Sequence, residues 1–176
     1  GTVATGGEAL QLDLSGHWTD LRWPLTGTPR WRSESGNWGL RGTLGNLAAT
    51  LQGRVNEAGR VDAAVTYRPD ALAAKLRWRE LAWPDPDRPW RSPAGSLAVS
   101  GAPTDYRYRI EARLAHGAQV GGQVTASGTG DLDGLRLAGL RAEILGGALT
   151  GEGELSWRPV PRARLAVNAD GLDPGA

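Results

Sequence analysis

Apolar and polar residues alternate one by one along most of this chain, and this alternation is the feature that most limits its fold. Between residues 106 and 114, Tyr106, Tyr108, Ile110, Ala112 and Leu114 alternate with Arg107, Arg109, Glu111 and Arg113. Successive side chains of a β-strand point to opposite faces of the sheet. The pattern therefore predicts strands with one apolar and one polar face. We expect the charged residues of this segment to be exposed, and Tyr106, Tyr108, Ile110 and Leu114 to be covered.

The same alternation recurs in segments of ordinary strand length, which are separated by short turn-forming segments. The turn-forming segments, rich in Gly, Pro, Asn and Asp, are 56–60, 68–71, 100–105, 132–134 and 145–147. Connections of hairpin length join antiparallel neighbours. We therefore predict an all-β chain of about a dozen strands. The expected architecture is one long antiparallel sheet, curled into a taco-like groove.

A longer repeat of about sixty residues is superimposed on the strand pattern. The motif W-x-x-L-x-W-P occurs at 18–24 and again at 78–84, and W-R-S-x-x-G follows it at 31–36 and at 90–95. Self-similarity at this period is typical of stacked units that bury their faces against their neighbours. We expect the whole chain, 1–176, to be one β-rich segment of a larger repeat array. Its units are expected at approximately 10–70 and 71–135, with a partial unit at 136–176.

The tryptophans of these motifs have two interpretations. As structural residues, they close the apolar end of each unit, with Pro24 and Pro84 preventing further strand pairing. As functional residues, they line the mouth of a groove or contact a membrane interface, where an amphipathic indole is favoured. The residues concerned are Trp18, Trp23, Trp31, Trp78, Trp83 and Trp90.

Composition and motifs give no sign of catalysis. The 20 Lys and Arg residues nearly balance the 19 Asp and Glu residues, so no strongly basic surface for nucleic acid is expected, and the chain has no cysteine. His17 and His116 lie far apart in no metal-binding or catalytic motif. Asp85 and Asp87 flank a proline and are interpreted as a solvated turn. We expect no enzyme activity, no cofactor and no metal.

Three segments resemble the TamB-like translocation and assembly module family, which is related to the AsmA-like envelope proteins. They are DLRWPL at 20–25, GNWGLRGTL at 36–44 and ILGGALTGEGELSWRPVPRARLAVNADGLDPG at 144–175. The resemblance implies a periplasmic β-rich protein of a Gram-negative bacterium, anchored in the inner membrane, with a long apolar groove. It also implies a role in moving phospholipids between the inner and outer membranes, and in outer-membrane protein assembly with a partner barrel that regions outside this chain would contact.

The inward-facing residues are small or aliphatic, since aromatic residues make up 6% of the chain and Phe is absent. A closed sandwich would lack the large side chains that fill its midplane, so we expect the face to bind phospholipid acyl chains. The other expected partners are neighbouring repeats of the same chain, and no nucleic acid. The predicted groove lining is Leu51, Val55, Val61, Val65, Leu72, Leu76, Leu97, Val99, Tyr108, Ile110, Leu114, Leu137, Ile144, Leu155 and Val167.

Three alternatives to lipid conduction stay open at the level of the sequence. The apolar face is equally compatible with the dry core of a sandwich or barrel. A free strand edge is compatible with a scaffold or chaperone that assists the assembly of outer-membrane proteins, such as autotransporters, by strand pairing. Arginine and tryptophan together are compatible with a nucleic-acid or glycan-binding β module.

Overall fold

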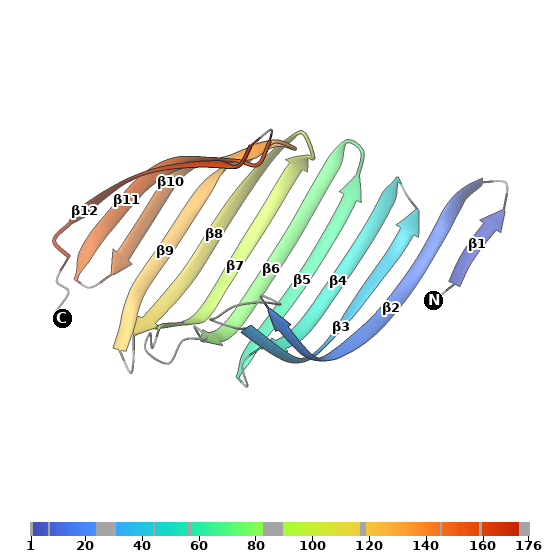
Figure 1. Ribbon diagram of the computed structural model, residues 1–176, viewed down its shortest axis with the longest axis horizontal. Coiled ribbons are helices and arrows are strands. Elements are labelled where there is room, and N and C mark those ends of the chain that lie inside the picture. Colours follow the sequence, from blue (N-terminus) through green and yellow to red (C-terminus); the bar gives the residue numbers. More distant parts are fainter. Residues whose placement is uncertain are drawn as a thin grey trace.

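The structure is a computed structural model that describes residues 2–6, 8–23, 31–43, 45–55, 58–82, 90–116, 119–144, 146–158 and 160–172. Side chains are described within these ranges from residue 12 onward, except at 20–23, 31–34 and 119–120. The chain forms one twelve-stranded sheet (Figure 1). Its strands are β1 (Thr2–Gly6), β2 (Glu8–Trp23), β3 (Trp31–Thr43), β4 (Asn46–Val55), β5 (Gly59–Arg68), β6 (Ala71–Ala82), β7 (Trp90–Ala102), β8 (Asp105–His116), β9 (Gln119–Gly130), β10 (Gly134–Ile144), β11 (Gly147–Ser156) and β12 (Arg162–Asp170).

Every strand pairs with the next one along the chain, and all the pairings are antiparallel. The ends of the chain therefore lie at opposite ends of the sheet (Figure 1). The all-β fold and the single antiparallel sheet confirm the prediction, and the described residues contain no helix. Among these residues, no helix is long and apolar enough to cross a membrane.

The predicted strong curl is wrong, because the sheet is open and only gently bent (Figure 1). The strands β1 and β12 are the two edges of the sheet and do not pair with each other. The alternation of residues fixes which face each side chain occupies, but every antiparallel pairing is compatible with a flat, twisted or curled sheet. Curvature therefore could not be predicted from the pattern that revealed the strands.

A β-bulge in β10 explains a change of phase that is visible in the sequence. Leu135 and Leu137 occupy odd positions, whereas Leu140 and Ile144 occupy even positions. The register of β10 shifts between Leu137 and Leu140 against β11, and between Leu137 and Gly139 against β9. An extra residue in one strand reverses the alternation beyond it. Both sets of residues therefore stay on the same face of the sheet.

The turn between β9 and β10 illustrates how local chemistry places the strands. The Asp131 carboxylate accepts hydrogen bonds from the backbone amides of Asp133 and Gly134, at 2.7 and 2.9 Å. The Asp131 amide donates to the carbonyl of Gly134 at 3.0 Å. A side chain that binds amides two and three residues ahead stabilises a tight turn. This turn starts β10 in register with β9, as the LDG segment predicts.

The sheet is a single layer, and its apolar side chains are not fully covered. Among the described residues, the buried hydrophobic ones are Ala115 and Ala142, which are 1% and 4% exposed. In β8, Arg107, Arg109 and Arg113 are exposed, as predicted, but Glu111 is half-buried. The expectation that Tyr106, Tyr108, Ile110 and Leu114 are covered is only partly met, since all of them are half-buried. One sheet without a second layer shields each face only through neighbouring side chains.

Candidate functional site

The register of the strands assembles the inward residues into rows that cross the sheet, and we call this surface the apolar face. In two central rows, each residue stands directly opposite the inward residue of the next strand. One row contains Trp38, Leu51, Ala63, Leu76, Leu97, Ile110, Ala126 and Leu140. The other contains Leu40, Ala49, Val65, Ala74, Val99, Tyr108, Gly128 and Leu137. The central rows therefore run without interruption from β3 to β10.

Two border rows flank the central rows and are richer in glycine and aromatic residues. One contains Trp18, Gly36, Gly53, Val61, Trp78, Gly95, Ala112, Val124 and Ala142. The other contains Gly42, Leu47, Tyr67, Leu72, Gly101, Tyr106, Gly130, Leu135 and Leu155. The apolar face thus has an aliphatic middle, and its borders contain aromatic rings next to glycines.

All the predicted lining residues lie on the apolar face. The central rows and their continuation into β12 hold Leu51, Leu76, Leu97, Ile110, Val167, Val65, Val99, Tyr108 and Leu137. The border rows hold Val61, Leu72 and Leu155, and the next inward positions along the strands hold Val55, Leu114 and Ile144. None of them is buried, and Leu51, Leu155 and Val167 are 39%, 41% and 44% exposed. The face is therefore accessible to a ligand.

Trp38 belongs to a central row but is absent from the predicted lining. Its side chain is 41% exposed, and it stands opposite Leu51 on β4. The alternation of Gly36, Trp38 and Leu40 was the available signal. The apolar face therefore begins at least one strand earlier than the predicted lining.

Aromatic rings on the apolar face lie over glycines of the neighbouring strand. A Cβ atom added to Gly36 would overlap the Trp18 ring, and one added to Gly95 would overlap the Trp78 ring. The same holds for Gly130 beneath Tyr106, where the added Cβ would lie 2.5 Å from the hydroxyl oxygen. An aromatic ring that covers a cross-strand glycine fills the space left by the missing side chain. The glycines are thus the places where the rings lie down against the sheet.

Trp78 is fixed further by a hydrogen-bond bridge across three strands. Its indole Nε1 donates to the Ser92 hydroxyl at 2.8 Å, and that hydroxyl donates to the Arg113 carbonyl at 2.8 Å. Ser92 belongs to the W-R-S-x-x-G motif, where the register of β7 against β8 shifts between Arg91 and Gly95. A bulge at this point brings the serine within reach of both partners. The motif therefore holds β6, β7 and β8 together.

The first copy of the motif has the same register as the second. Trp18 stands opposite Gly36 and Leu21 opposite Ser33, just as Trp78 stands opposite Gly95 and Leu81 opposite Ser92. The register of β3 against β4 shifts between Ser33 and Ser35, which is the position equivalent to the shift in β7. The two hairpins β2–β3 and β6–β7 are therefore equivalent in pairing.

The remaining predicted closure residues differ in how far the structure describes them. Trp90 packs against His116, which is exposed, with ring centroids 4.8 Å apart and an interplanar angle of 47°. Trp23 and Trp31 are directly opposed partners of β2 and β3, of which only the backbone is described. Trp83, like Asp85 and Asp87, lies outside the described residues. Trp18, Trp78 and Trp90 thus contact neighbouring strands, and their role in closing the apolar end of a unit stays a prediction.

Tyr108 is the one described group with a clear change of acidity. Its hydroxyl donates to the carbonyl of Arg136 at 3.2 Å, which links β8 to β10 across Gly128. Burial raises the pKa of the Tyr108 hydroxyl above the ordinary tyrosine value, and the neighbouring Tyr106 raises it further. The hydroxyl therefore stays neutral and acts as a hydrogen-bond donor.

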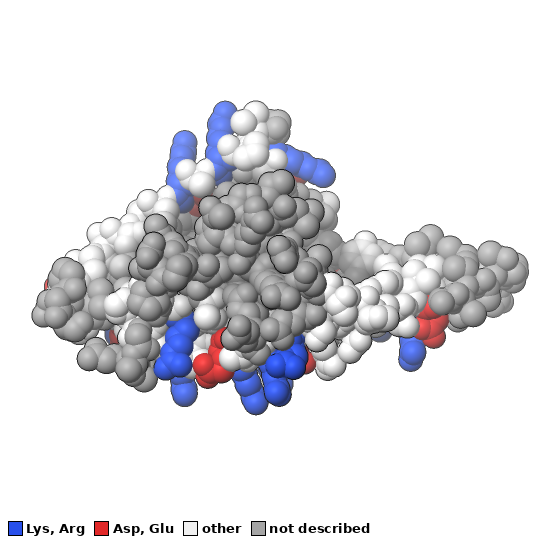
Figure 2. All heavy atoms as spheres, turned by 60° about the horizontal axis from the view of Figure 1, so that its bottom comes forward, with Lys and Arg blue, Asp and Glu red and all other residues white. Residues whose placement is uncertain are grey.

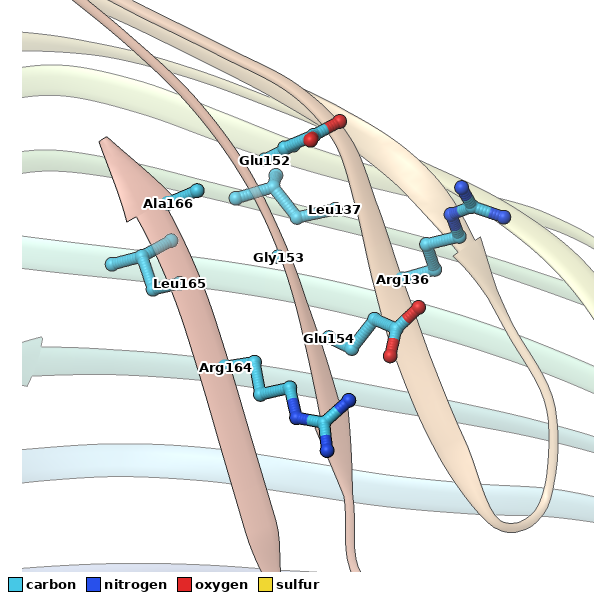
Figure 3. A pocket seen from close by; sticks show the side chains of 8 residues that line it. All are labelled: Arg136, Leu137, Glu152, Gly153, Glu154, Arg164, Leu165 and Ala166. Carbon is cyan, nitrogen blue, oxygen red and sulfur yellow. The ribbon is translucent and has the colours of Figure 1, made fainter. Parts of the chain in front are cut away.

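A shallow hollow of about 340 Å³ lies at the C-terminal end of the sheet (Figure 3). The apolar part of its lining is Leu137 and Leu165, with Gly153 between them on β11. The charged part is Glu152 together with Arg136, Glu154 and Arg164, and the last three stand side by side on β10, β11 and β12. Leu165 is 65% exposed. The hollow is open, and most of its lining residues, such as Arg136, Glu152 and Arg164, belong to the polar face.

The described residues hold no group of three or more His, Cys, Asp or Glu side chains that would bind a metal ion. Within the same residues, His17 is exposed on β2. Arg109–Glu111 at 2.7 Å and Arg141–Glu143 at 3.1 Å are salt bridges on the polar face. What this part of the chain presents is a broad apolar surface on one side and a charged surface on the other.

Comparison with known proteins gives one match. Residues 46–176, more than half of the chain, match the family described as "TamB, N-terminal domain". No curated protein and no solved structure matches the chain. The matched region covers β4 to β12 and therefore most of the apolar face. The chain belongs to the TamB family, as a form of its N-terminal domain.

Proposed function

We propose that the apolar face binds the acyl chains of phospholipids and conducts them between the inner and outer membranes. TamB proteins are envelope proteins of Gram-negative bacteria that form a translocation and assembly module. A periplasmic location and an apolar cargo are both consistent with this family. The observation that carries the proposal is the uncovered state of the central rows. Their aliphatic residues form one strip over eight strands and are half-buried or exposed.

The length of the strip suits a lipid path. From β3 to β10 the central rows cross seven intervals between strands, and at ~4.8 Å each this is about 34 Å. The hydrocarbon core of a bilayer is about 30 Å thick. A lipid tail laid across the strands is therefore supported along its whole length, and further units of the same kind would extend the path.

The energetics favour sliding over tight binding. Burial of a methylene group contributes about 0.8 kcal/mol, so a tail of about sixteen carbons gains on the order of 10 kcal/mol when fully covered. An open face covers one side of the tail, so the gain is about half of this. Similar aliphatic side chains follow one another along the strip, so no single position holds the tail much more strongly than the next. The polar head group stays in water at the border.

The repeat is part of the same proposal. We infer that the equivalent hairpins β2–β3 and β6–β7 each begin a unit of about sixty residues. The predicted limits of these two units are approximately 10–70 and 71–135. The two units share an equivalent Trp-over-Gly contact, Trp18 over Gly36 and Trp78 over Gly95, and each holds a stretch of the aliphatic rows. Stacked units then give a continuous apolar face, because the strand register of one unit continues into the next.

A charge placed in the strip tests the proposal. Ile110→Asp or Val65→Asp would put a carboxylate among the aliphatic rows and raise the free energy of an acyl chain beside it by several kcal/mol. We expect the purified protein to retain phospholipid, detectable by native mass spectrometry, and the variants to lose it. Arg109→Asp is the matched control, because Arg109 is an exposed neighbour of Ile110 on the polar face. Unchanged lipid content in Ile110→Asp, with an intact β circular dichroism spectrum, would contradict the proposal.

A second candidate function is a scaffold for outer-membrane proteins, in which an exposed strand of the sheet pairs with a strand of the client protein. All residues of β12 are exposed, and within the described part of the chain this strand pairs with β11 alone. A free edge accepts another strand through backbone hydrogen bonds. Crosslinking at Leu165 to a nascent outer-membrane protein, with none at Leu76, would favour the scaffold over the lipid path.

A further inference from the structure

The polar face carries a row of three like charges on adjacent strands. Arg54 of β4 stands directly opposite Arg60 of β5, which stands directly opposite Arg79 of β6. All three are exposed. Directly opposed residues have Cβ atoms about 5 Å apart, and like charges at that distance destabilise the sheet. We call these residues the arginine row.

In another part of the sheet, directly opposed charged residues alternate in sign and therefore attract one another. On β10, β11 and β12, Arg136, Glu154 and Arg164 are directly opposed partners, and the glutamate lies between the two arginines (Figure 3). In other strands, arginines pair with carboxylates, as in Arg41–Asp13 at 3.5 Å. Neither Arg60 nor Arg79 forms an ion pair with any residue that the structure describes. Arg60 and Arg79 thus differ from the paired arginines of the same sheet, whereas Arg54 has an interaction partner.

A polar hollow of about 480 Å³ adjoins the arginine row. Arg54 and Arg60 line it together with Thr19, Ser35, Asn37 and Gln52. These hydroxyl and amide groups supply hydrogen-bond donors beside the guanidinium groups. Asp62 is the one carboxylate among the described lining residues, and it stands opposite Arg77 of β6. Two arginines and one carboxylate therefore line the hollow. Figure 2 shows Lys and Arg side chains at the margins of the molecule, with Asp and Glu side chains among them.

We propose that the arginine row and its hollow bind a phosphate group. A guanidinium fork matches phosphate oxygens with two parallel hydrogen bonds, and a doubly charged anion relieves the repulsion among neighbouring arginines. The phosphate belongs either to a free anion or to a lipid head group at a membrane surface. The site lies on the face opposite the central rows, so it is separate from the proposed path of the acyl chains and does not depend on it.

The test compares Arg60→Gln with the matched control Arg136→Gln. Binding of inorganic phosphate is measured by calorimetry, and binding to vesicles is measured by sedimentation, with phosphatidylcholine alone and with added phosphatidic acid. We expect Arg60→Gln to weaken binding at least about tenfold, since charge-assisted hydrogen bonds are lost, and Arg136→Gln to leave it unchanged. Binding in both assays supports a site for phosphate of either source, and binding only to the acidic vesicles assigns the site to lipid head groups. Absence of binding in both, or an equal loss in Arg136→Gln, would overturn the proposal.

Reciprocal charge exchanges give a readout that does not depend on the probe. Arg60→Glu creates the alternating pattern of Arg136, Glu154 and Arg164, so the denaturation midpoint without phosphate should rise while phosphate binding disappears. Glu154→Arg creates a second row of like charges and should lower the midpoint. A midpoint that falls in Arg60→Glu, in a variant with the wild-type circular dichroism spectrum, would show that the arginines do not repel one another and would count against the site.

Discussion

Trp78 and Leu76 lie two residues apart on the same strand and on the same face, yet their surroundings differ. Trp78 lies over Gly95, and its indole nitrogen is held by Ser92. Leu76 is directly opposite Ala63 on β5 and Leu97 on β7, and these are its neighbours in the row. The ring is fixed against the backbone of the next strand, whereas the leucine contributes to an uncovered strip. Alternation alone assigns both residues to one apolar surface, but their neighbours give them different tasks.

On the apolar face, fixed aromatic rings thus lie beside an uncovered aliphatic strip that we propose as a binding surface. The aromatic rings over glycines tie strands together at the borders and at a few central positions. The aliphatic residues between them keep a surface that neighbouring side chains cover only in part. This arrangement lets the sheet remain stable as a single layer without burying the strip that we propose as the lipid path. Mutations of the two kinds of residue should therefore separate stability from binding.

The largest expected effect is that of Trp78→Ala. Loss of the ring uncovers Gly95 and leaves the Ser92 hydroxyl without its indole donor, so we expect the free energy of unfolding to fall by about 2–3 kcal/mol. Leu76→Ala, the matched change two residues away, should lower it by about 1 kcal/mol because that side chain is already half exposed. Urea denaturation of both variants measures the difference. Equal losses would show that the ring is no more structural than the leucine.

A second prediction sharpens the ring-over-glycine contact. Gly95→Ala places a methyl group where the Trp78 ring lies, and the displaced ring should lower the free energy of unfolding by about 1–2 kcal/mol. In the Trp78→Ala background the same methyl group meets empty space, so the penalty should largely disappear. A double-mutant cycle measures this coupling. Additive effects would mean that the ring moves aside freely.

Ser92→Ala tests the bridge between three strands. The hydroxyl accepts from Trp78 and donates to the Arg113 carbonyl, so its removal should lower the free energy of unfolding by about 1 kcal/mol. The control is Ser100→Ala, an exposed serine of the same strand, which should have little effect. A comparable loss in both variants would argue against the bridge.

The smallest expected effect concerns alkaline pH and Tyr108. Its pKa is raised by burial and by Tyr106. A raised folded-state pKa contributes stability that is fully present below about pH 10 and is lost as the pH rises through the folded-state pKa. Tyr108→Phe should therefore show a weaker loss of stability above pH 10 than the unaltered protein. Thermal melts at pH 8 and at pH 10.5 measure it, and identical pH dependence in the two proteins would contradict the assignment.

The strands and their faces were predictable from the sequence because alternation reports directly on the side a residue occupies. The turn residues also indicated the antiparallel order. The change of alternation between Leu137 and Leu140 was the sequence sign of the bulge in β10. The ring-over-glycine contacts could not be predicted from alternation, since they depend on which residues stand opposite one another across strands. Trp78 and Gly95 are separated by a hairpin whose register the alternation leaves open by steps of two. A repeated Trp-to-Gly spacing in both motifs was the available clue.

The curl of the sheet and the exposure of the strip could not be predicted for a different reason. Both depend on what packs against a face, and alternation is the same for a dry core and for an open surface. Residues such as Leu51 and Val65 have the same pattern in either case. The predicted curl was therefore wrong, whereas the lining of a lipid groove by this face stays a prediction.

The central claim, that the aliphatic strip is occupied by lipid tails, is tested most directly by photo-crosslinking in cells. A photoreactive residue replaces Ile110 or Leu76 on the strip, or Arg109 on the polar face, and crosslinked phospholipid is identified by mass spectrometry. We predict lipid adducts at Ile110 and Leu76 and none at Arg109, which lies next to Ile110 but points to the opposite side of the sheet. Adducts confined to protein at Ile110 and Leu76, or equal lipid capture at Arg109, would contradict the account.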